Sequence, residues 1–185
     1  MRDVGHDLQC IGQSWSARLS NVVSMRWHEF AEVAPDLARL GRDRLESQGL
    51  ALVGTLRRDA SPRISPVEPY FVGEELMLGM MWHSMKALDL LRDARVVVHS
   101  ATTDREGLEG DFKLYGTAVP RDDPVARAGY SDATFARIDW RPPDLFHLFA
   151  IDIQSAGYVV FGDQRFGLSW YPGSPPRRFE IEPDL

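Results

Sequence analysis

The chain has 185 residues, of which 44% are hydrophobic and 26% charged, a composition typical of one globular domain that excludes global disorder. Its 21 basic and 27 acidic residues give a net charge of −6, which argues against nucleic acid or an anionic membrane as the main partner. The single cysteine, Cys10, excludes an internal disulfide and a cysteine-based zinc cage. Because the sequence shows neither a bilayer-length apolar run nor a secretory signal, we expect a cytoplasmic protein.

Residues 1–25 are polar and differ from the rest, so we expect a loose N-terminal extension followed by a single domain over residues 26–185. From Trp27 to Leu40, apolar residues recur at spacings of three and four, which predicts a helix. Pro35 predicts a break in that helix, with a second helix over residues 36–47.

A series of short apolar or alternating segments follows, as is typical of an all-β barrel or sandwich. Segment 62–72 contains three prolines, which predict an edge strand or a bulged strand. Ser84 and the Asp123-Pro124 pair each predict the start of a helix, over residues 84–93 and 123–137. Residues 172–176 are expected to form a loop. The predicted strands are 50–56, 62–72, 76–82, 96–100, 111–119, 145–153, 158–161 and 166–171.

Familiar catalytic signatures are missing from the sequence. There is no GxxxxGK[ST] loop, GxGxxG, GxSxG or HExxH motif, and the five histidines show no metal-ligand spacing. The acidic residues are dispersed and form no obvious pair. We therefore predict neither a metal site nor a catalytic side chain.

Three residues instead form a candidate anion-binding group. Arg63 lies on a strand beside a turn, Ser84 precedes a helix, and Lys86 falls in the first turn of that helix. A helix N-terminus carries free N–H groups and a partial positive charge, both of which suit a phosphate. A lysine there opposes the helix dipole, and a bound anion would account for it. The alternative is that Ser84 only caps the helix while Arg63 and Lys86 are solvated surface residues.

The order and spacing of several segments resemble the pyridoxamine 5'-phosphate oxidase-like FMN-binding split-barrel superfamily. The matching segments are Pro-Arg-Ile-Ser-Pro-Val at 62–67, Ser-Met-Lys-Ala at 84–87, Leu-Arg-Asp-Ala-Arg-Val at 91–96 and Asp-Phe-Lys-Leu-Tyr-Gly-Thr-Ala at 111–118. The opening from Trp27 to Leu37 is similar to the N-terminal helix of a bacterial branch of that superfamily. The resemblance covers residues 26–171.

This resemblance implies a mainly β (α+β) fold, a six-stranded antiparallel split β-barrel with peripheral helices. It also implies a homodimer with FMN, or the related deazaflavin, at the subunit interface. Arg63, Ser84 and Lys86 would hold the cofactor phosphate. The residues expected near the isoalloxazine ring are Ile64, Ser65, Gly79, Met80, Asp111 and Trp170. Trp170 would cover the ring from the partner subunit or, alternatively, belong to the core.

The chain departs from the family pattern in several places. Ala60 stands in the turn at 58–61 where glycine is usual, and Asp111 replaces a neutral amide. The vitamin oxidases carry an Arg-x-His pair near the C-terminus, which is missing here, so pyridoxamine phosphate oxidation is not expected. The resemblance implies a flavin- or deazaflavin-dependent oxidoreductase of a small molecule. The alternatives are a non-catalytic flavin-binding module and a haem-binding or haem-degrading barrel, with His83 or His99 as the haem ligand.

Overall fold

The computed structural model describes residues 25–162 and 165–182, so the predicted extension lies outside the described residues except for Met25. Helices α1 (Trp27–Val33) and α2 (Pro35–Gln48) come first, and the chain breaks between them where predicted. Pro35 is the first residue of α2, a position where its missing N–H and fixed φ are tolerated. Helices α3 (Met85–Arg92) and α4 (Pro124–Ile138) follow later in the chain.

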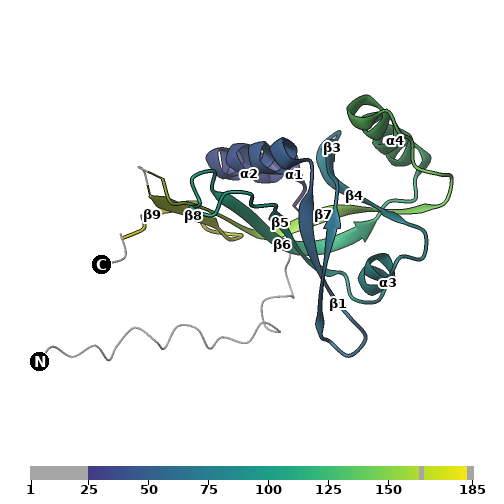
Figure 1. Ribbon diagram of the computed structural model, residues 1–185, viewed down its shortest axis with the longest axis horizontal. Coiled ribbons are helices and arrows are strands. Elements are labelled where there is room, and N and C mark those ends of the chain that lie inside the picture. The colour runs from purple at the N-terminus through teal and green to yellow at the C-terminus, as the bar shows by residue number, and fades with distance from the viewer. Residues whose placement is uncertain (1–24, 163–164, 183–185) are drawn as a thin grey trace, which may run out of the picture.

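All strand pairs are antiparallel, so the predicted mainly β class with peripheral helices is confirmed (Figure 1). The predicted count of six strands is not confirmed, because the sheet has nine strands and is open. The strands are β1 (Ala51–Leu56), β2 (Pro62–Val67), β3 (Pro69–Val72), β4 (Glu75–Met81), β5 (Arg95–Ser100), β6 (Asp111–Pro120), β7 (Phe146–Val160), β8 (Phe166–Trp170) and β9 (Arg177–Glu180).

The strand order is β2-β1-β5-β6-β7-β4-β3, with β8 paired to β7 and β9 paired to β8. Only Glu68 separates β2 from β3, although these strands lie at opposite ends of the order. The sheet must therefore curve until its two ends come close together. The proline-rich segment 62–72 thus forms two edge strands, which confirms the edge-strand prediction. Proline suits an edge because it cannot donate a hydrogen bond to a neighbouring strand.

One predicted boundary in the second half of the sheet was wrong. The segments 145–153 and 158–161, predicted as two strands, form the single strand β7. Its register against β6 shifts between Tyr115 and Gly116, so that Gln154 is the extra residue of a bulge. The polar and small residues that suggested a break mark this bulge. Strand β9 was not predicted, because all four of its residues are exposed and show no alternation.

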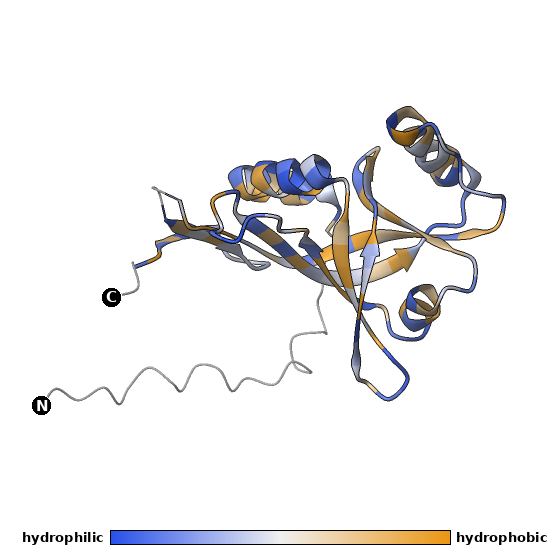
Figure 2. Cartoon of the chain, viewed as in Figure 1, coloured by the Kyte–Doolittle hydropathy of each residue, from blue (hydrophilic) through white to orange (hydrophobic). Residues whose placement is uncertain are grey.

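The core lies between the sheet and the α1–α2 pair, and the polar residues of α2 face away from it (Figure 2). Phe30, Leu37 and Leu45 are fully buried there. Gly41 lets α2 approach the sheet closely, since a Cβ at this position would lie 2.5 Å from the Phe112 ring. A smaller apolar cluster includes Tyr130 of α4 and Tyr70 of β3. No helix among the described residues is long and apolar enough to cross a membrane.

Candidate functional site

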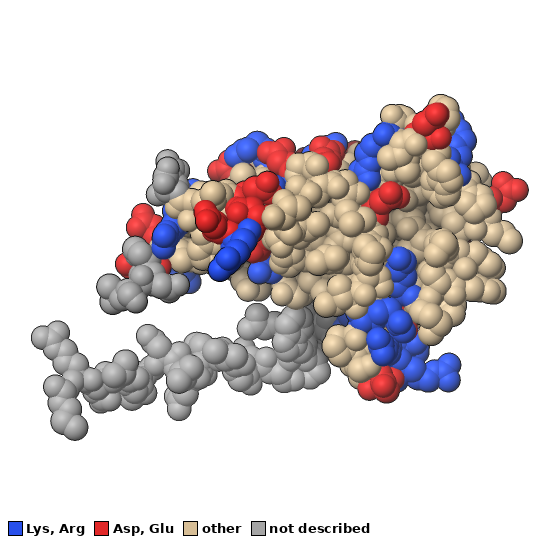
Figure 3. Space-filling view, in the orientation of Figure 1, with Lys and Arg blue, Asp and Glu red and all other residues tan. Residues whose placement is uncertain are grey.

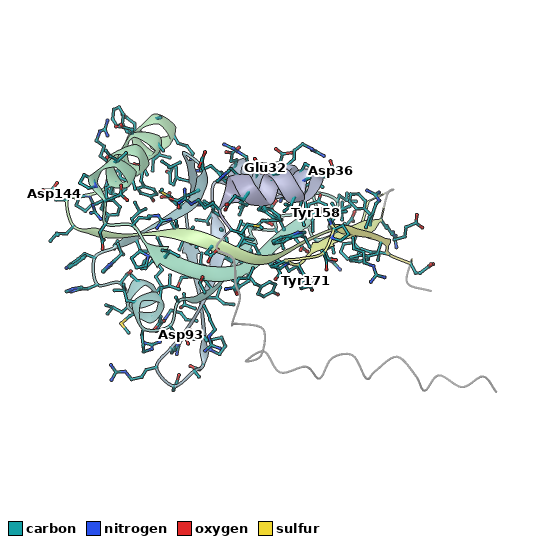
Figure 4. All side chains as sticks on the ribbon, turned by 180° about the vertical axis from the view of Figure 1, so that it is seen from behind. Glu32, Asp36, Asp93, Asp144, Tyr158 and Tyr171 are labelled. Atoms are coloured by element: carbon teal, nitrogen blue, oxygen red, sulfur yellow. The ribbon has the colours of Figure 1, made fainter. Side chains whose placement is uncertain are left out.

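Strand β2 and helix α3 are joined by two side-chain contacts. The Nε of Arg63 donates to Oδ2 of Asp89 over 2.6 Å, and Nζ of Lys86 donates to the carbonyl oxygen of Pro66 over 3.0 Å. The structure therefore brings Arg63 and Lys86 to one pair of elements. Figure 4 shows Asp93, at the end of α3, on the opposite side of the molecule from the α1–α2 pair.

Asp89 organises this junction, and sequence reasoning missed it. Its carboxylate is almost fully buried and accepts hydrogen bonds from Thr55, Arg63 and Arg92. Burial raises the pKa of this carboxyl, but the bonds from Arg63, Arg92 and Thr55 outweigh burial and hold the pKa below its usual value. Asp89 is therefore an anion that orients two guanidinium groups.

Helix α3 does not bury all of its apolar residues, which explains why Asp89 was overlooked. Ala87 and Leu90 are buried, whereas Leu88 and Leu91 are 38% and 51% exposed. The buried face takes in Asp89 instead. One feature of the sequence could have pointed to Asp89: it lies three residues after Lys86, about one helical turn along α3, and therefore on the same side of the helix.

Ser84 occupies the N-cap position of α3 as predicted, but its side chain makes no capping hydrogen bond. Its Oγ atom is buried without a hydrogen-bond partner among the described residues. A buried hydroxyl of this kind calls for a partner that supplies or accepts a hydrogen bond.

Lys86 also lacks an anionic partner. Its ammonium group reaches only the Pro66 carbonyl, and it forms no ion pair within the described part of the chain. Burial lowers the pKa of the Lys86 side chain. The Ser84 hydroxyl at the N-cap and the Lys86 ammonium in the first turn of α3 fit a phosphate group, because a phosphate accepts hydrogen bonds and carries negative charge.

The residues expected near the isoalloxazine ring differ in how exposed their side chains are. Ile64 is 72% exposed and Ser65 is half-buried, both on edge strand β2, whose side opposite β1 pairs with no described strand. Met80 of β4 is buried in the core. The side-chain position of Gly79 is filled by Tyr130, whose hydroxyl would lie 2.3 Å from a Cβ there. Ile64 and Ser65 therefore lie on an open strand edge, whereas the side-chain positions of Gly79 and Met80 are filled or buried.

Asp111 and Trp170 lie away from the junction. Asp111 starts β6, where its Oδ1 is 3.7 Å from Nε2 of His99 and 3.4 Å from Nζ of Lys113. Strands β1 and β5 separate β6 from β2. Trp170 is 2% exposed and packs against Phe30 with ring centroids 5.2 Å apart, so its side chain lies in the core.

The two histidines considered as haem ligands differ in their surroundings. His83 is exposed, has φ of 56°, and stacks on Trp82, which also stacks on His147. Nδ1 of His99 lies 2.7 Å from the carbonyl oxygen of Ser100, so that nitrogen carries the proton. Among the described residues, no group of three or more His, Cys, Asp or Glu side chains is placed to hold a metal ion.

The chain matches known proteins when structures are compared, but not when sequences are. No family model and no curated protein matches the chain. A pyridoxamine 5'-phosphate oxidase-related, FMN-binding protein from Nostoc punctiforme has a similar structure, with a TM-score of 0.58 at 14% identity over 80% of this chain and 96% of that one. A NimC/NimA family protein from Clostridium acetobutylicum matches with a TM-score of 0.56 at 12% identity, over 83% and 99% of the two chains.

A haem-binding protein from Mycobacterium smegmatis is also similar, with a TM-score of 0.56 at 18% identity. The match covers 71% of this chain but only 57% of that protein, so the chain spans little more than half of its length. These similarities show a shared fold: the chain folds like pyridoxamine 5'-phosphate oxidase-related, NimC/NimA family and haem-binding proteins of known structure. The resemblance read from the sequence is thereby confirmed at the level of the fold.

Proposed function

We propose that the chain binds FMN, with the cofactor phosphate at the N-terminus of α3, and acts as an oxidoreductase of a small organic molecule. The observation that carries this proposal lies at the start of α3, where the buried Ser84 hydroxyl has no hydrogen-bond partner and the Lys86 ammonium has no anionic partner among the described residues. Similar structures include an FMN-binding protein, which supports the choice of cofactor.

In this proposal each side chain has a distinct task. Lys86 supplies a positive charge, and Ser84 supplies a hydroxyl donor to a phosphate oxygen. Arg63 uses Nε to bind Asp89, which leaves its terminal nitrogens to donate toward the same phosphate. The isoalloxazine ring would lie against the unpaired edge of β2 at Ile64 and Ser65.

The bound flavin would supply the hydride-transfer chemistry, and the chain would supply binding and orientation. This division of labour agrees with a site built from a lysine, a serine and an arginine tied to a buried carboxylate, none of which is arranged as an acid–base pair. Deazaflavin is the alternative cofactor, because the same phosphate position serves both. A non-catalytic flavin-binding module remains the alternative function.

Haem binding is the second candidate function, favoured by one specific feature. His83 presents an exposed imidazole beside the Trp82 ring, on a backbone with a left-handed φ that few residues other than glycine adopt. A haem-binding protein is among the similar structures. A Soret band on addition of haem, lost in H83A, would establish this function in place of the flavin.

The flavin proposal is tested by titrating the purified chain with FMN and following flavin fluorescence. K86A is expected to weaken FMN binding by about tenfold or more, because a charge-assisted contact contributes about 1.5–3 kcal/mol. R105A is the matched control: it removes one positive charge from an exposed residue, and we expect its FMN affinity to stay within about twofold of the unmodified chain. Equal affinity in K86A and the unmodified chain would refute the assignment of Lys86.

A further inference from the structure

The turn that joins β1 to β2 and the exposed side of α3 border a hollow of about 800 Å³ that is open to solvent. Four arginines line it: Arg57, Arg58, Arg63 and Arg92. In the space-filling view, Lys and Arg side chains gather on this lower part of the molecule (Figure 3).

The acidic residues of the hollow are already engaged. Asp89 is buried and binds Arg63 and Arg92, and Asp59 accepts two hydrogen bonds from Ser61, at 3.0 and 2.7 Å. Four arginines against two aspartates leave the lining with a net charge of +2. The positive charge of this hollow is therefore not cancelled from within.

Arg57 and Arg58 carry this excess charge. Both are exposed, and neither forms an ion pair with any described residue. Elsewhere on the surface, by contrast, Arg42 pairs with Glu46 at 2.9 Å. Met85 and Leu88, which are 58% and 38% exposed, add an apolar wall to the hollow. Guanidinium forks beside an apolar wall suit a small organic acid, because carboxylates and phosphates accept two parallel hydrogen bonds from arginine.

We propose that this hollow binds the acidic end of a small molecule, through a carboxylate or phosphate distinct from the group held at Ser84 and Lys86. The inference rests on the proposed function and deepens it, because Arg63 lines this hollow and is also the arginine assigned to the cofactor phosphate, so the acid would be held beside the bound cofactor. The acid would belong to a separate substrate, bound beside the cofactor.

The test uses isothermal titration calorimetry of the full chain with pyrophosphate and with citrate, in the absence and presence of FMN. The double variant R57A/R58A is expected to bind the better of these two probes about tenfold or more weakly. R177A/R178A is the matched control, because it removes two adjacent exposed arginines on β9. Its affinity for the probe should stay within about twofold of the unmodified chain. Thermal unfolding of both variants checks that each remains folded.

The titration with FMN shows whether the two anion positions are separate. A probe that binds equally well to the FMN-loaded chain supports a separate acidic substrate, whereas mutual exclusion of probe and FMN would show that both use one site and would overturn the inference. Equal losses in R57A/R58A and R177A/R178A, or no binding of either probe, would overturn the inference. A chain that binds the probe through Arg57 and Arg58 but binds no FMN would refute the proposed function and leave this inference standing.

Discussion

Asp89 links the stability of the chain to the geometry of its candidate site. One buried carboxylate holds Arg63 of β2 and Arg92 of α3, and Thr55 of β1 completes its hydrogen bonds. Buried charges are tolerated only when they are paired and hydrogen-bonded, and Asp89 meets both conditions. Its partners lie 26 and 34 positions away in the sequence at Arg63 and Thr55, so no local pattern could reveal them.

The substitution D89N tests this role at the level of one residue. We expect it to lower the free energy of unfolding by about 2–3 kcal/mol, because hydrogen bonds to charged groups contribute about 1.5–3 kcal/mol. D93N, at the exposed end of the same helix, should cost less than about 1 kcal/mol. Denaturant unfolding measures both, and equal losses in the two variants would contradict the role given to Asp89.

The same residue predicts a dependence on pH. The pKa of Asp89 is lower in the folded chain than in the unfolded chain. Its contribution is therefore fully present above the unfolded pKa of about 4 and is lost as pH falls through the folded pKa. The stability difference between the unmodified chain and D89N should accordingly shrink below about pH 4.

Individual residues of the candidate site could be predicted from the sequence when the signal was local. Lys86 opposes the helix dipole, and Ser84 stands where an N-cap belongs, so both could be found from the spacing alone. Met80 and Trp170 could not be placed in this way, because which face of a strand is buried depends on what packs against it. Both side chains lie in the core.

At the level of elements, the hairpin formed by β1 and β2 carries local strain. Ala60 has φ of 64° in the turn between these strands, a conformation that glycine adopts without cost. The family resemblance in the sequence implies glycine at this position, and the positive φ of Ala60 gives the physical reason. The turn is also one wall of the arginine-lined hollow, to which Arg57, Arg58 and Asp59 belong.

A60G is therefore expected to stabilise the chain. Placing an L-residue in the left-handed region costs about 1–2 kcal/mol, and the greater entropy of glycine in the unfolded chain offsets part of the gain. We expect a net increase of about 0.5–1 kcal/mol in the free energy of unfolding, measured by denaturant titration. A loss of stability in A60G would show that the alanine methyl group makes a favourable contact outweighing the strain.

Elements with a clear hydrophobic period could be predicted, and those without one could not. Helices α1 and α2 and the edge position of the proline-rich segment agree with their sequence patterns. The bulge at Gln154 and the exposed strand β9 depend on their partner strands, which supply the hydrogen bonds and the register. The number of strands in the open sheet also depends on such pairing, because β8 joins β7 and β9 joins β8 at its margin.

At the scale of the whole molecule, one face of the sheet exposes apolar side chains from neighbouring strands. Leu52 is 40% exposed, Ile64 72% and Tyr115 45%, and their registers place them on the same face of β1, β2 and β6. Contiguous exposed apolar surface is typical of a protein–protein interface. This exposed face fits the homodimer that the sequence resemblance implies, with the candidate cofactor site beside it.

We expect I64E to convert a dimer of two 20.9 kDa chains into a monomer, because a charge would be buried at the centre of this face. V125E is the matched control: Val125 is 83% exposed on α4, away from that face. Light scattering coupled to size-exclusion chromatography measures the molar mass of each variant. A monomeric unmodified chain, or a dimeric I64E variant, would contradict the proposed interface.

We propose that Ser84 and Lys86 recognise a phosphate, and a comparison of FMN with riboflavin, which lacks that phosphate, tests this recognition. The unmodified chain should bind FMN about tenfold or more tightly than riboflavin, and K86A should lose most of that preference, since one charge-assisted contact contributes about 1.5–3 kcal/mol. Equal affinity of the unmodified chain for the two flavins would contradict the phosphate site at the start of α3.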